Sequence, residues 1–320
     1  MQPVRWGILG AAKFARDHMA RAINAAEGAK LAGLATSAPE KAAPFQAFAP
    51  DLTVYDSYDA LLADPEIDVV YIPLPNHLHV EWTLHALKAG KHVLCEKPIA
   101  MNEAAFDTLI EARDAAGLLA AEAYMIVHSP VWQRAREIYE SGELGAVSFV
   151  DAVFTYDNSD DPGNIRNRPE TGGGSLPDIG VYTIGSVRFV TGEEPAELAA
   201  SIRRENDVDV FAHVTADFPS FRYTSMTSMR MFPRQEVTFH GTEGVMRVTA
   251  PFNANVFDQA ALSVERAGFN VAHQRWPGLN QYVHQVQNFG NTIRDGAPYP
   301  CPLEFSRGTQ AVIDRALAAG

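Results

Sequence analysis

The fold is decided by one short segment, His92-Val93-Leu94-Cys95-Glu96-Lys97-Pro98. Its apolar residues predict a buried strand, and Pro98 ends that strand because it has no N–H and disfavours helical dihedrals at Lys97. The ammonium group of Lys97 is therefore expected at the carboxyl edge of a sheet, where open α/β sheets bind ligands. A lysine taken alone is more often solvated, or paired here with Glu96, so the neighbouring segments have to decide.

The bulk composition is that of an ordinary globular protein with enough chain for two domains. The 320 residues are 47% hydrophobic and 20% charged. A net charge of −13 would repel nucleic acid and anionic membranes, so neither is expected as a partner. The two cysteines have no paired spacing and offer neither a disulfide framework nor a zinc ribbon. Without a signal peptide or an apolar run of membrane length, a cytoplasmic location is expected.

The N-terminal segment predicts a strand over residues 4–10, followed by a tight turn and a helix to about residue 25. The turn reads Gly10-x-Ala12-x-x-Ala15, where a dinucleotide fold has G-x-G-x-x-G/A. Small residues allow the turn, the approach of a pyrophosphate and the packing of helix on strand, and the pyrophosphate would lie on N–H groups at the helix start. A plain strand–turn–helix is the alternative. The predicted cofactor contacts are Gly10, Ala11, Ala12, Lys13 and Phe14.

The end of the second predicted strand, residues 30–35, bears on the choice of cofactor. A site for NAD places a carboxylate here, which accepts a hydrogen bond from the ribose 2′-OH. This chain has hydroxyls and a lysine instead, at Thr36, Ser37 and Lys41. Donors and a cation attract a 2′-phosphate that a carboxylate would repel, so the sequence favours NADP, with NAD as the second choice. The alternative is that Ser37 caps the next helix and Lys41 is solvated.

Residues 68–72 form a continuous apolar run, which is typical of a parallel sheet covered on both faces. The loop after this run is expected to contact the cofactor through Pro73, Leu74, Asn76 and His79. Glu96 and Lys97, at the end of the following strand, are expected to join them. Repeated strand–helix units predict a doubly wound Rossmann domain over residues 1–123.

His77, His79 and His85 lie close together in the sequence, and histidine is a common metal ligand, so a metal site has to be considered. Their spacing is not the i, i+4 pair of a zinc-binding helix, and no carboxylate is placed to complete a site. No metal site is predicted.

From residue 124 the pattern changes to successive strands without intervening helices. Alternating residues predict strands at 147–156, 198–203, 208–218 and 221–229, and a hairpin joins 236–240 to 245–248. The sequence therefore predicts an α/β domain over residues 124–320 with a large, mostly antiparallel sheet. A wide sheet with one helical cover leaves a face to bury, so a homodimer or homotetramer through this sheet is expected.

A second polar segment lies inside this half, Gly172-Gly173-Gly174-Ser175-Leu176-Pro177-Asp178-Ile179-Gly180-Val181-Tyr182. Asp178 and Tyr182 are four residues apart and are expected on one face of a helix. A carboxylate and a phenol are residue types that alcohol dehydrogenation requires. The alternative is that Asp178 makes a structural hydrogen bond and Tyr182 packs with its hydroxyl outward.

Taken together, four segments resemble the Gfo/Idh/MocA family of NAD(P)-dependent oxidoreductases. They are the Gly10 turn, Pro75-Asn76-x-x-His79, Glu96-Lys97-Pro98 and Gly172-Gly173-Gly174-x-x-x-Asp178-x-Gly180-x-Tyr182. The resemblance implies a Rossmann domain followed by an α/β domain, in a dimer or tetramer that acts on a sugar or polyol-like substrate. Tyr182 stands where most members have His, which is similar to the glucose-fructose oxidoreductase, dimeric dihydrodiol dehydrogenase and xylose dehydrogenase branches. Many relatives carry Arg-Phe-His-Pro where this chain reads Val127-His128-Ser129-Pro130, so the identity of the sugar does not follow.

The mechanism implied by the resemblance is reversible hydride transfer between the nicotinamide and a C–OH group of the substrate. Tyr182 would move the hydroxyl proton, Lys97 would supply the cation that a phenol needs near neutral pH, and Asp178 would orient the substrate or the lysine. Tyr124 and Arg166 are expected as further substrate contacts, and Arg168 is a candidate that could equally be solvated. Two alternatives stay open: a transhydrogenase that keeps NADP bound, and a non-catalytic regulator that binds a dinucleotide and a sugar.

Overall fold

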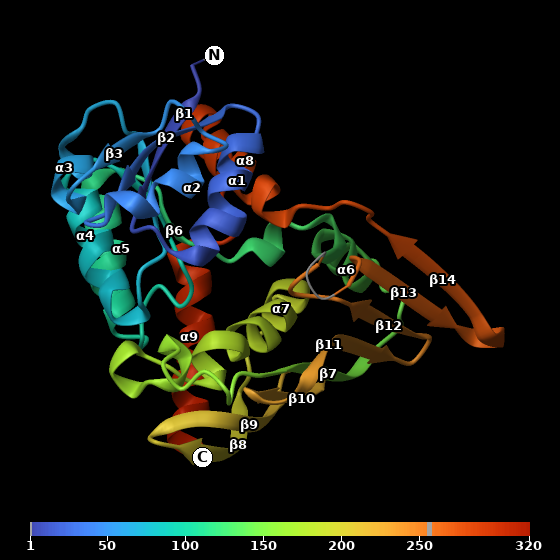
Figure 1. The fold of residues 1–320 in the computed structure, drawn as a ribbon. Helices are drawn as coiled ribbons and strands as arrows, with labels where there is room; N and C mark the ends of the chain where they lie inside the picture. The colour runs from blue at the N-terminus through green and yellow to red at the C-terminus, as the bar shows by residue number, and fades with distance from the viewer. Residues whose placement is uncertain (1, 255–257) are drawn as a thin grey trace. The chain divides into compact units, whose positions relative to one another are not determined.

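The computed structural model describes residues 2–254 and 258–320 (Figure 1). The chain forms two compact units: the residues up to His128 with Gln281–Ser306, and Ser129–Asn280 with Arg307–Gly320. The domains predicted from the sequence are the consecutive ranges 1–123 and 124–320. Residues 281–306 differ from that division because their helix packs on the first sheet, where the ring centroids of Phe289 and Trp6 lie 5.2 Å apart.

The first unit is built on a six-stranded sheet in the order β3-β2-β1-β4-β5-β6, in which every described pair is parallel. This confirms the doubly wound sheet predicted from the sequence. The carboxyl ends of parallel strands meet at one edge, so the loops after these strands share that edge. The strands are β1 (Val4–Leu9), β2 (Ala29–Ala35), β3 (Thr53–Tyr55), β4 (Val69–Ile72), β5 (His92–Cys95) and β6 (Ala120–Glu122).

Helices cover both faces of this sheet, with α3, α4 and α5 on one side and α1 and α8 on the other (Figure 1). Strand β1 shows why, because its side chains alternate between two buried layers. Gly7 faces Leu61 of α3, while Trp6 faces Phe289 of α8. The helices are α1 (Ala20–Ala25), α2 (Ala43–Gln46), α3 (Tyr58–Ala63), α4 (His79–Lys88), α5 (Ala105–Ala116) and α8 (Gln281–Asp295).

The second unit is built on an eight-stranded sheet in the order β14-β13-β12-β11-β7-β10-β9-β8. Its described pairs are antiparallel except β7 with β10, which confirms the large, mostly antiparallel sheet. The hairpin of β11 and β12 is also confirmed, since His240 pairs with Val245. The strands are β7 (Val147–Asp157), β8 (Glu197–Glu205), β9 (Val208–Asp217), β10 (Arg222–Ser228), β11 (Arg230–Gly241), β12 (Gly244–Thr249), β13 (Ala261–Arg266) and β14 (Asn270–Arg275).

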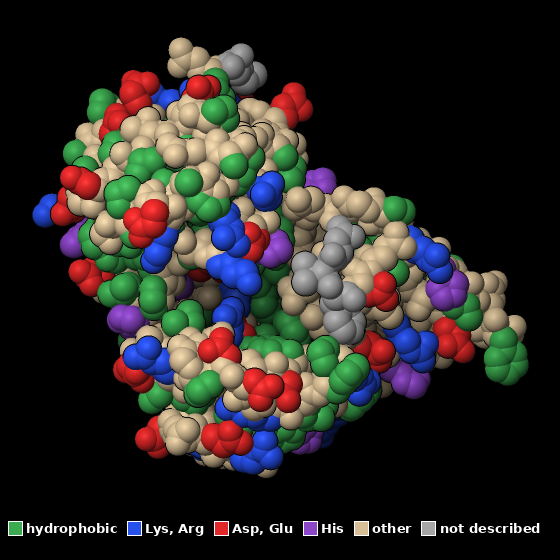
Figure 2. All heavy atoms as spheres, in the orientation of Figure 1, with side chains coloured by type: hydrophobic (Ala, Val, Ile, Leu, Met, Phe, Trp, Pro, Cys, Tyr) green, Lys and Arg blue, Asp and Glu red, His purple; other side chains and the backbone are tan. Residues whose placement is uncertain are grey.

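Strands β13 and β14 form a second hairpin that the sequence did not predict. Figure 2 shows hydrophobic side chains at its tip, where Phe269 is 92% exposed. Only Leu262 and Val264 of β13 are buried, and no residue of β14 is buried, so the alternation of apolar residues is weak.

Helices α6 (Pro130–Glu140) and α7 (Val181–Thr191) cover one face of the large sheet, and most of α9 (Leu303–Ala319) belongs to the same unit. Helix α7 is buried on every side from Val181 to Val190. A helix enclosed in this way has little freedom to shift, so the side chains at its start are held in fixed places. Among the described residues, no helix is long and apolar enough to cross a membrane.

The segment that replaces the Arg-Phe-His-Pro pattern, Val127–Pro130, runs from the buried turn Met125–His128 into the start of α6. Nδ1 of His128 lies 2.9 Å from the Asn288 amide nitrogen, which can only donate, so this ring nitrogen accepts and the ring is neutral. Burial lowers the pKa of His128 from 6.5 to about 3. Below pH 6.5, His128 therefore binds a proton in the unfolded chain but stays neutral in the folded unit until the pH approaches 3.

We predict that the first unit loses stability in mild acid because of this histidine. The stabilising effect of the depressed pKa is complete above pH 6.5 and is lost as the pH falls toward 3, by up to about 1.4 kcal/mol per pH unit. Thermal unfolding measured from pH 7 to pH 5 should show a smaller loss in His128→Gln than in the wild type. His273→Gln, at an exposed histidine of β14, is the control and should keep the wild-type slope. Equal slopes in all three proteins would contradict the assignment.

Candidate active site

The turn after β1 meets the requirements of a dinucleotide-binding turn. Gly10 has a φ of +95°, and a Cβ built there would lie 3.2 Å from both Leu74 Cδ2 and the Tyr58 hydroxyl. This backbone shape and this spacing suit glycine. The Arg16 N–H donates to Ala12 O at 3.1 Å, so helical bonding begins at Ala12. Amide groups at the start of a helix have no partner within it and attract anions, as the predicted pyrophosphate contact requires.

The end of β2 offers two exposed polar side chains. The Thr36 hydroxyl is buried and is used within its own turn, since it accepts from the Ala38 N–H at 3.2 Å. Ser37 and Lys41 are exposed, and Lys41 lies in the short helix Pro39–Lys41. Of the three residues predicted to contact a ribose 2′-phosphate, Ser37 and Lys41 are therefore exposed, and Thr36 is bonded within its own turn.

The loops after β4 and β5 are fastened to each other by His79. Its ring nitrogens lie 2.7 Å from the carbonyl oxygens of Leu74 and Pro98, and its side chain is completely buried. Burial lowers the pKa of His79. The hydrogen bonds to the carbonyls of Pro98 and Leu74 oppose that shift, because a carbonyl oxygen accepts from a protonated ring nitrogen. His79 is predicted from the sequence as a cofactor contact, and in the structure its ring nitrogens contact the carbonyls of both loops.

Lys97 is half-buried and lies between acidic groups of the first unit. Glu96 accepts a hydrogen bond from the Tyr71 hydroxyl at 2.6 Å. Glu122, at the end of β6, is 4% exposed and accepts from the Ile99 N–H at 2.9 Å. Burial raises the pKa of Glu122, and the Ile99 N–H, Ser306 and the charge of Lys97 oppose the rise. This edge of the sheet thus carries Lys97 beside two carboxylate side chains, Glu96 and Glu122, that are fixed by hydrogen bonds.

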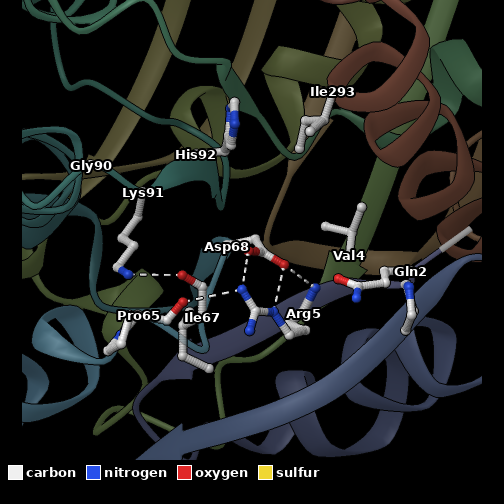
Figure 3. Close-up of a pocket in the computed structure, with 11 residues that line it drawn as sticks. Gln2, Val4, Arg5, Pro65, Ile67, Asp68, Gly90, Lys91, His92 and Ile293 are labelled. Atoms are coloured by element: carbon white, nitrogen blue, oxygen red, sulfur yellow. Dashed lines mark hydrogen bonds and ion pairs between the residues drawn. The ribbon is translucent and has the colours of Figure 1, made fainter.

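The cavity drawn in Figure 3 lies at the opposite, amino edge of this sheet. It measures about 390 Å³ and is lined by the starts of β1, β4 and β5. Its cations are satisfied by the chain itself: Arg5 forms a bidentate pair with Asp68, and Lys91 donates to the carbonyls of Asp64 and Ile67. These bonds tie the strand starts together, so the cavity offers little to a charged ligand.

In the second unit, Asp178 is the centre of a cluster of polar side chains. One oxygen, Oδ2, accepts from the Tyr156 hydroxyl at 2.7 Å and from Arg166 Nε at 2.9 Å. The pKa of Arg166 is raised, mostly by the charge of Asp178 and to a smaller degree by Tyr156 and Tyr182. Arg166 is therefore bonded to Asp178, and Tyr182 adds only a smaller electrostatic effect.

Tyr182 is held by aromatic packing at the start of α7. It is 6% exposed, and its ring centroid lies 5.5 Å from that of Phe252 and 5.9 Å from that of Phe154. Asp178 belongs to the π-helical turn Leu176–Gly180 that leads into α7. Such turns are frequent at functional sites because they shift side chains out of the regular helical register.

The three glycines before this turn allow the Arg166 loop to lie against it. The N–H groups of Gly173 and Gly174 donate to the carbonyls of Arg168 and Arg166 at 3.0 and 3.1 Å. A Cβ at Gly173 would collide with the Arg166 carbonyl oxygen. Any other residue at Gly173 would push the loop away, and with it the guanidinium that contacts Asp178.

Two other residues that the sequence predicts as candidate substrate contacts lie in different surroundings. Arg168 pairs with Glu170 and is about half-exposed, as a solvated residue would be. Tyr124 is 1% exposed and packs near Phe305 in the first unit. Sequence reasoning missed Tyr156, although the alternation in β7 had marked its face, because nothing in the sequence connects it to Asp178. Among the described residues, no group of three His, Cys, Asp or Glu side chains could hold a metal ion.

These features define a protein with a dinucleotide-binding domain and a second, sheet-based α/β domain. Residues 4–124 match the family model described as the oxidoreductase family with an NAD-binding Rossmann fold, and residues 132–247 match the Gfo/Idh/MocA C-terminal domain. An uncharacterized oxidoreductase of Rhizobium meliloti is 37% identical over 98% of this chain and 96% of its own length. The D-xylose 1-dehydrogenase (NADP(+)) 2 of Haloferax volcanii is 30% identical over 97% and 95%.

Among solved structures, a 3-ketoreductase from Actinomadura kijaniata in complex with NADP and TDP-benzene has a TM-score of 0.90. It is 26% identical, and the match covers 99% of this chain and 98% of that one. The chain belongs to the Gfo/Idh/MocA family of oxidoreductases. This confirms the resemblance drawn from the sequence, and with it the prediction of an oxidoreductase that carries a dinucleotide-binding Rossmann domain.

Proposed function

We propose that this protein transfers hydride between NADP and a C–OH group of a sugar or polyol-like substrate. The observation that carries the proposal is the cluster of Tyr156, Arg166 and Asp178, just ahead of Tyr182 in the same unit, in a chain whose other unit carries Lys97 after β5. A relative named as an NADP-dependent xylose dehydrogenase and a structural neighbour named as a 3-ketoreductase support this substrate class.

The side chains divide the chemistry as follows. The nicotinamide, when bound, accepts or returns the hydride. Lys97 donates to the substrate oxygen as negative charge develops there. Tyr182 moves the hydroxyl proton, and because a phenol has a pKa near 10 it needs a cation nearby. Arg166 is that cation within the second unit, and Asp178 fixes its orientation and that of the substrate hydroxyl.

The proposed preference for NADP rests on the end of β2. No carboxylate follows the strand directly, and the exposed Ser37 and Lys41 provide a donor and a cation for a 2′-phosphate. The turn at Gly10, with Ala11, Ala12, Lys13 and Phe14, would hold the pyrophosphate that NADP and NAD share.

We further propose a homodimer or homotetramer formed through the large sheet, in the cytoplasm. Most of the exposed large hydrophobic side chains that the structure describes belong to this sheet or its turns, namely Phe149, Met231, Phe232, Phe269 and Val271. Exposed apolar groups on a sheet are typical of a surface that another copy covers. Both cysteines are buried and outside any disulfide, which fits a reducing compartment.

The direct test of function is the absorbance of reduced nicotinamide with NADP or NAD and a panel of aldoses, anhydrosugars and polyols. A member of the panel should support turnover with NADP. Lys97→Ala and Tyr182→Phe should each lower kcat by about 10²-fold to 10⁴-fold, as expected for the loss of an acid–base group. If both residues act on the same substrate step, the double variant should be far less impaired than the product of the two single losses. A double loss equal to that product would separate them, and near-normal single variants would remove them from the chemistry.

Lys41→Ala should weaken NADP much more than NAD. The lysine is proposed to contact only the 2′-phosphate, and the loss of one charge-assisted contact corresponds to about tenfold or more in affinity. Dissociation constants from nicotinamide fluorescence give the comparison. Lys13→Ala is the matched control, because an exposed lysine at the pyrophosphate turn should affect both cofactors alike. Equal losses for NADP and NAD in Lys41→Ala would contradict the 2′-phosphate assignment.

Phe149→Glu should shift the protein to monomers. This side chain is 40% exposed on the large sheet, and a charge there would oppose burial against a second copy. Light scattering after size-exclusion chromatography measures the mass. Ile165→Ser is the control, since Ile165 is 38% exposed but lies in a loop outside the sheet. A wild-type protein that is already monomeric, or a variant with unchanged mass, would contradict the interface.

A further inference from the structure

The helix that carries Asp178 and Tyr182 begins without the local cap that its sequence suggests. Ser175-x-x-Asp178 has the pattern of a capping box, in which the serine and the acid satisfy N–H groups of their own helix start. In the structure Ser175 is already helical, with φ −71° and ψ −38°, and its side chain makes no capping bond. The Asp178 N–H bonds to Gly174 O at 3.1 Å instead.

A carboxylate from a distant strand takes over this position. Oδ2 of Asp209, in β9, accepts from the Leu176 N–H at 2.7 Å and from the Ser175 hydroxyl at 2.8 Å. Asp209 is 4% exposed, so it is a buried charge with assigned partners. Ser175 also lies 3.0 Å from Thr227 Oγ1, so the helix start is bound to both β9 and β10.

The third glycine of the triplet makes this contact possible. Gly174 has a φ of +142°, and a Cβ there would collide with Asp209 Oδ1. Two physical constraints therefore require glycine at this position: a backbone conformation that other residues avoid, and the close approach of a carboxylate to the main chain. The glycine triplet and Asp209 therefore form one packed contact at the helix start, although Asp209 lies 35 positions after Gly174 in the sequence.

This arrangement decides what the Asp178 carboxylate can do. The start of a helix attracts negative charge, and an acid at the third helical position can reach back to cap it. With Asp209 on the Leu176 N–H and the Ser175 hydroxyl, the helix start is already satisfied. The Asp178 carboxylate then bonds to Arg166 and Tyr156.

We propose that Asp209 is a positioning residue, which caps the helix start in place of Asp178 and so keeps the Asp178 carboxylate on Arg166 and available to the substrate. The inference rests on the proposed function, in which Asp178 and Tyr182 act on the substrate. Asp209 itself touches neither substrate nor cofactor. Its loss would draw Asp178 toward the vacant cap and away from the cluster.

The test compares kcat, KM and cofactor affinity in Asp209→Ala, Asp178→Asn and the double variant, with the substrate found in the panel and NADP. Asp209→Ala removes the oxygen that caps the helix and should lower kcat by about tenfold to a hundredfold, as misplacement of a reacting group does. The dissociation constant for NADP should stay unchanged, because the proposed cofactor contacts lie in the other unit. If Asp209 acts through Asp178, the double variant should be no slower than Asp178→Asn.

A purely structural role gives a different result. Val214→Ala, at a buried valine of the same strand, is the matched control: it should lower the melting temperature and keep the wild-type kcat. A near-normal kcat in Asp209→Ala, or losses that multiply in the double variant, would overturn the positioning role. If Asp209→Ala does not fold, Ser175→Ala replaces it and should lower kcat several-fold, and an unchanged kcat there would overturn the proposal.

The same experiment separates this inference from the proposed function. A slow Asp178→Asn beside a fast Asp209→Ala would contradict the positioning role alone. A near-normal rate for Asp178→Asn would contradict the role of Asp178 in the reaction, and the positioning role would fall with it.

Discussion

The second half of the candidate site depends on one oxygen atom, Oδ2 of Asp178, which binds Tyr156 and Arg166 together. A carboxylate at the start of a helix is drawn toward the amide groups of that start, so it has to be kept from capping its own helix. In this protein the cap comes from Asp209, and two glycines allow the close contacts on either side: Gly173 toward the Arg166 loop and Gly174 toward Asp209. The glycines of this segment thus allow neighbouring chain segments to pack closely around the charged Asp178.

The first unit solves a different problem, which is to bring loops from separate strands to one edge. Parallel pairing does most of this, because the carboxyl ends of β1, β2, β4 and β5 share an edge. His79 adds a direct tie between the loops after β4 and β5, and Glu122 holds the Ile99 N–H in the loop after β5. Buried polar groups here are satisfied by neighbouring loops, so they fix positions that flexible loops would otherwise leave variable.

Sequence reasoning reached the main features because they depend on local patterns. The apolar runs of β4 and β5 and the proline after Lys97 are enough to predict a parallel sheet and its edge, and the alternation in β7 and the hairpin at Gly241 and Gly244 predict the second sheet. What it missed depends on contacts between distant residues. The return of α8 to the first unit, the weakly patterned β13 and β14, and the roles of Tyr156 and Asp209 all require knowledge of which segments lie side by side.

The central claim is that hydride passes between a sugar C–OH carbon and the nicotinamide. The most direct measurement uses the active substrate deuterated at the carbon that is oxidised, with NADP, followed by mass spectrometry and NMR of the reduced cofactor. The account predicts one deuterium at C4 of the nicotinamide, on a single face, and a slower transfer than with the unlabelled substrate. Binding of NADP and sugar without any deuterium in the cofactor would contradict the account and would make the protein a binding or regulatory member of its family.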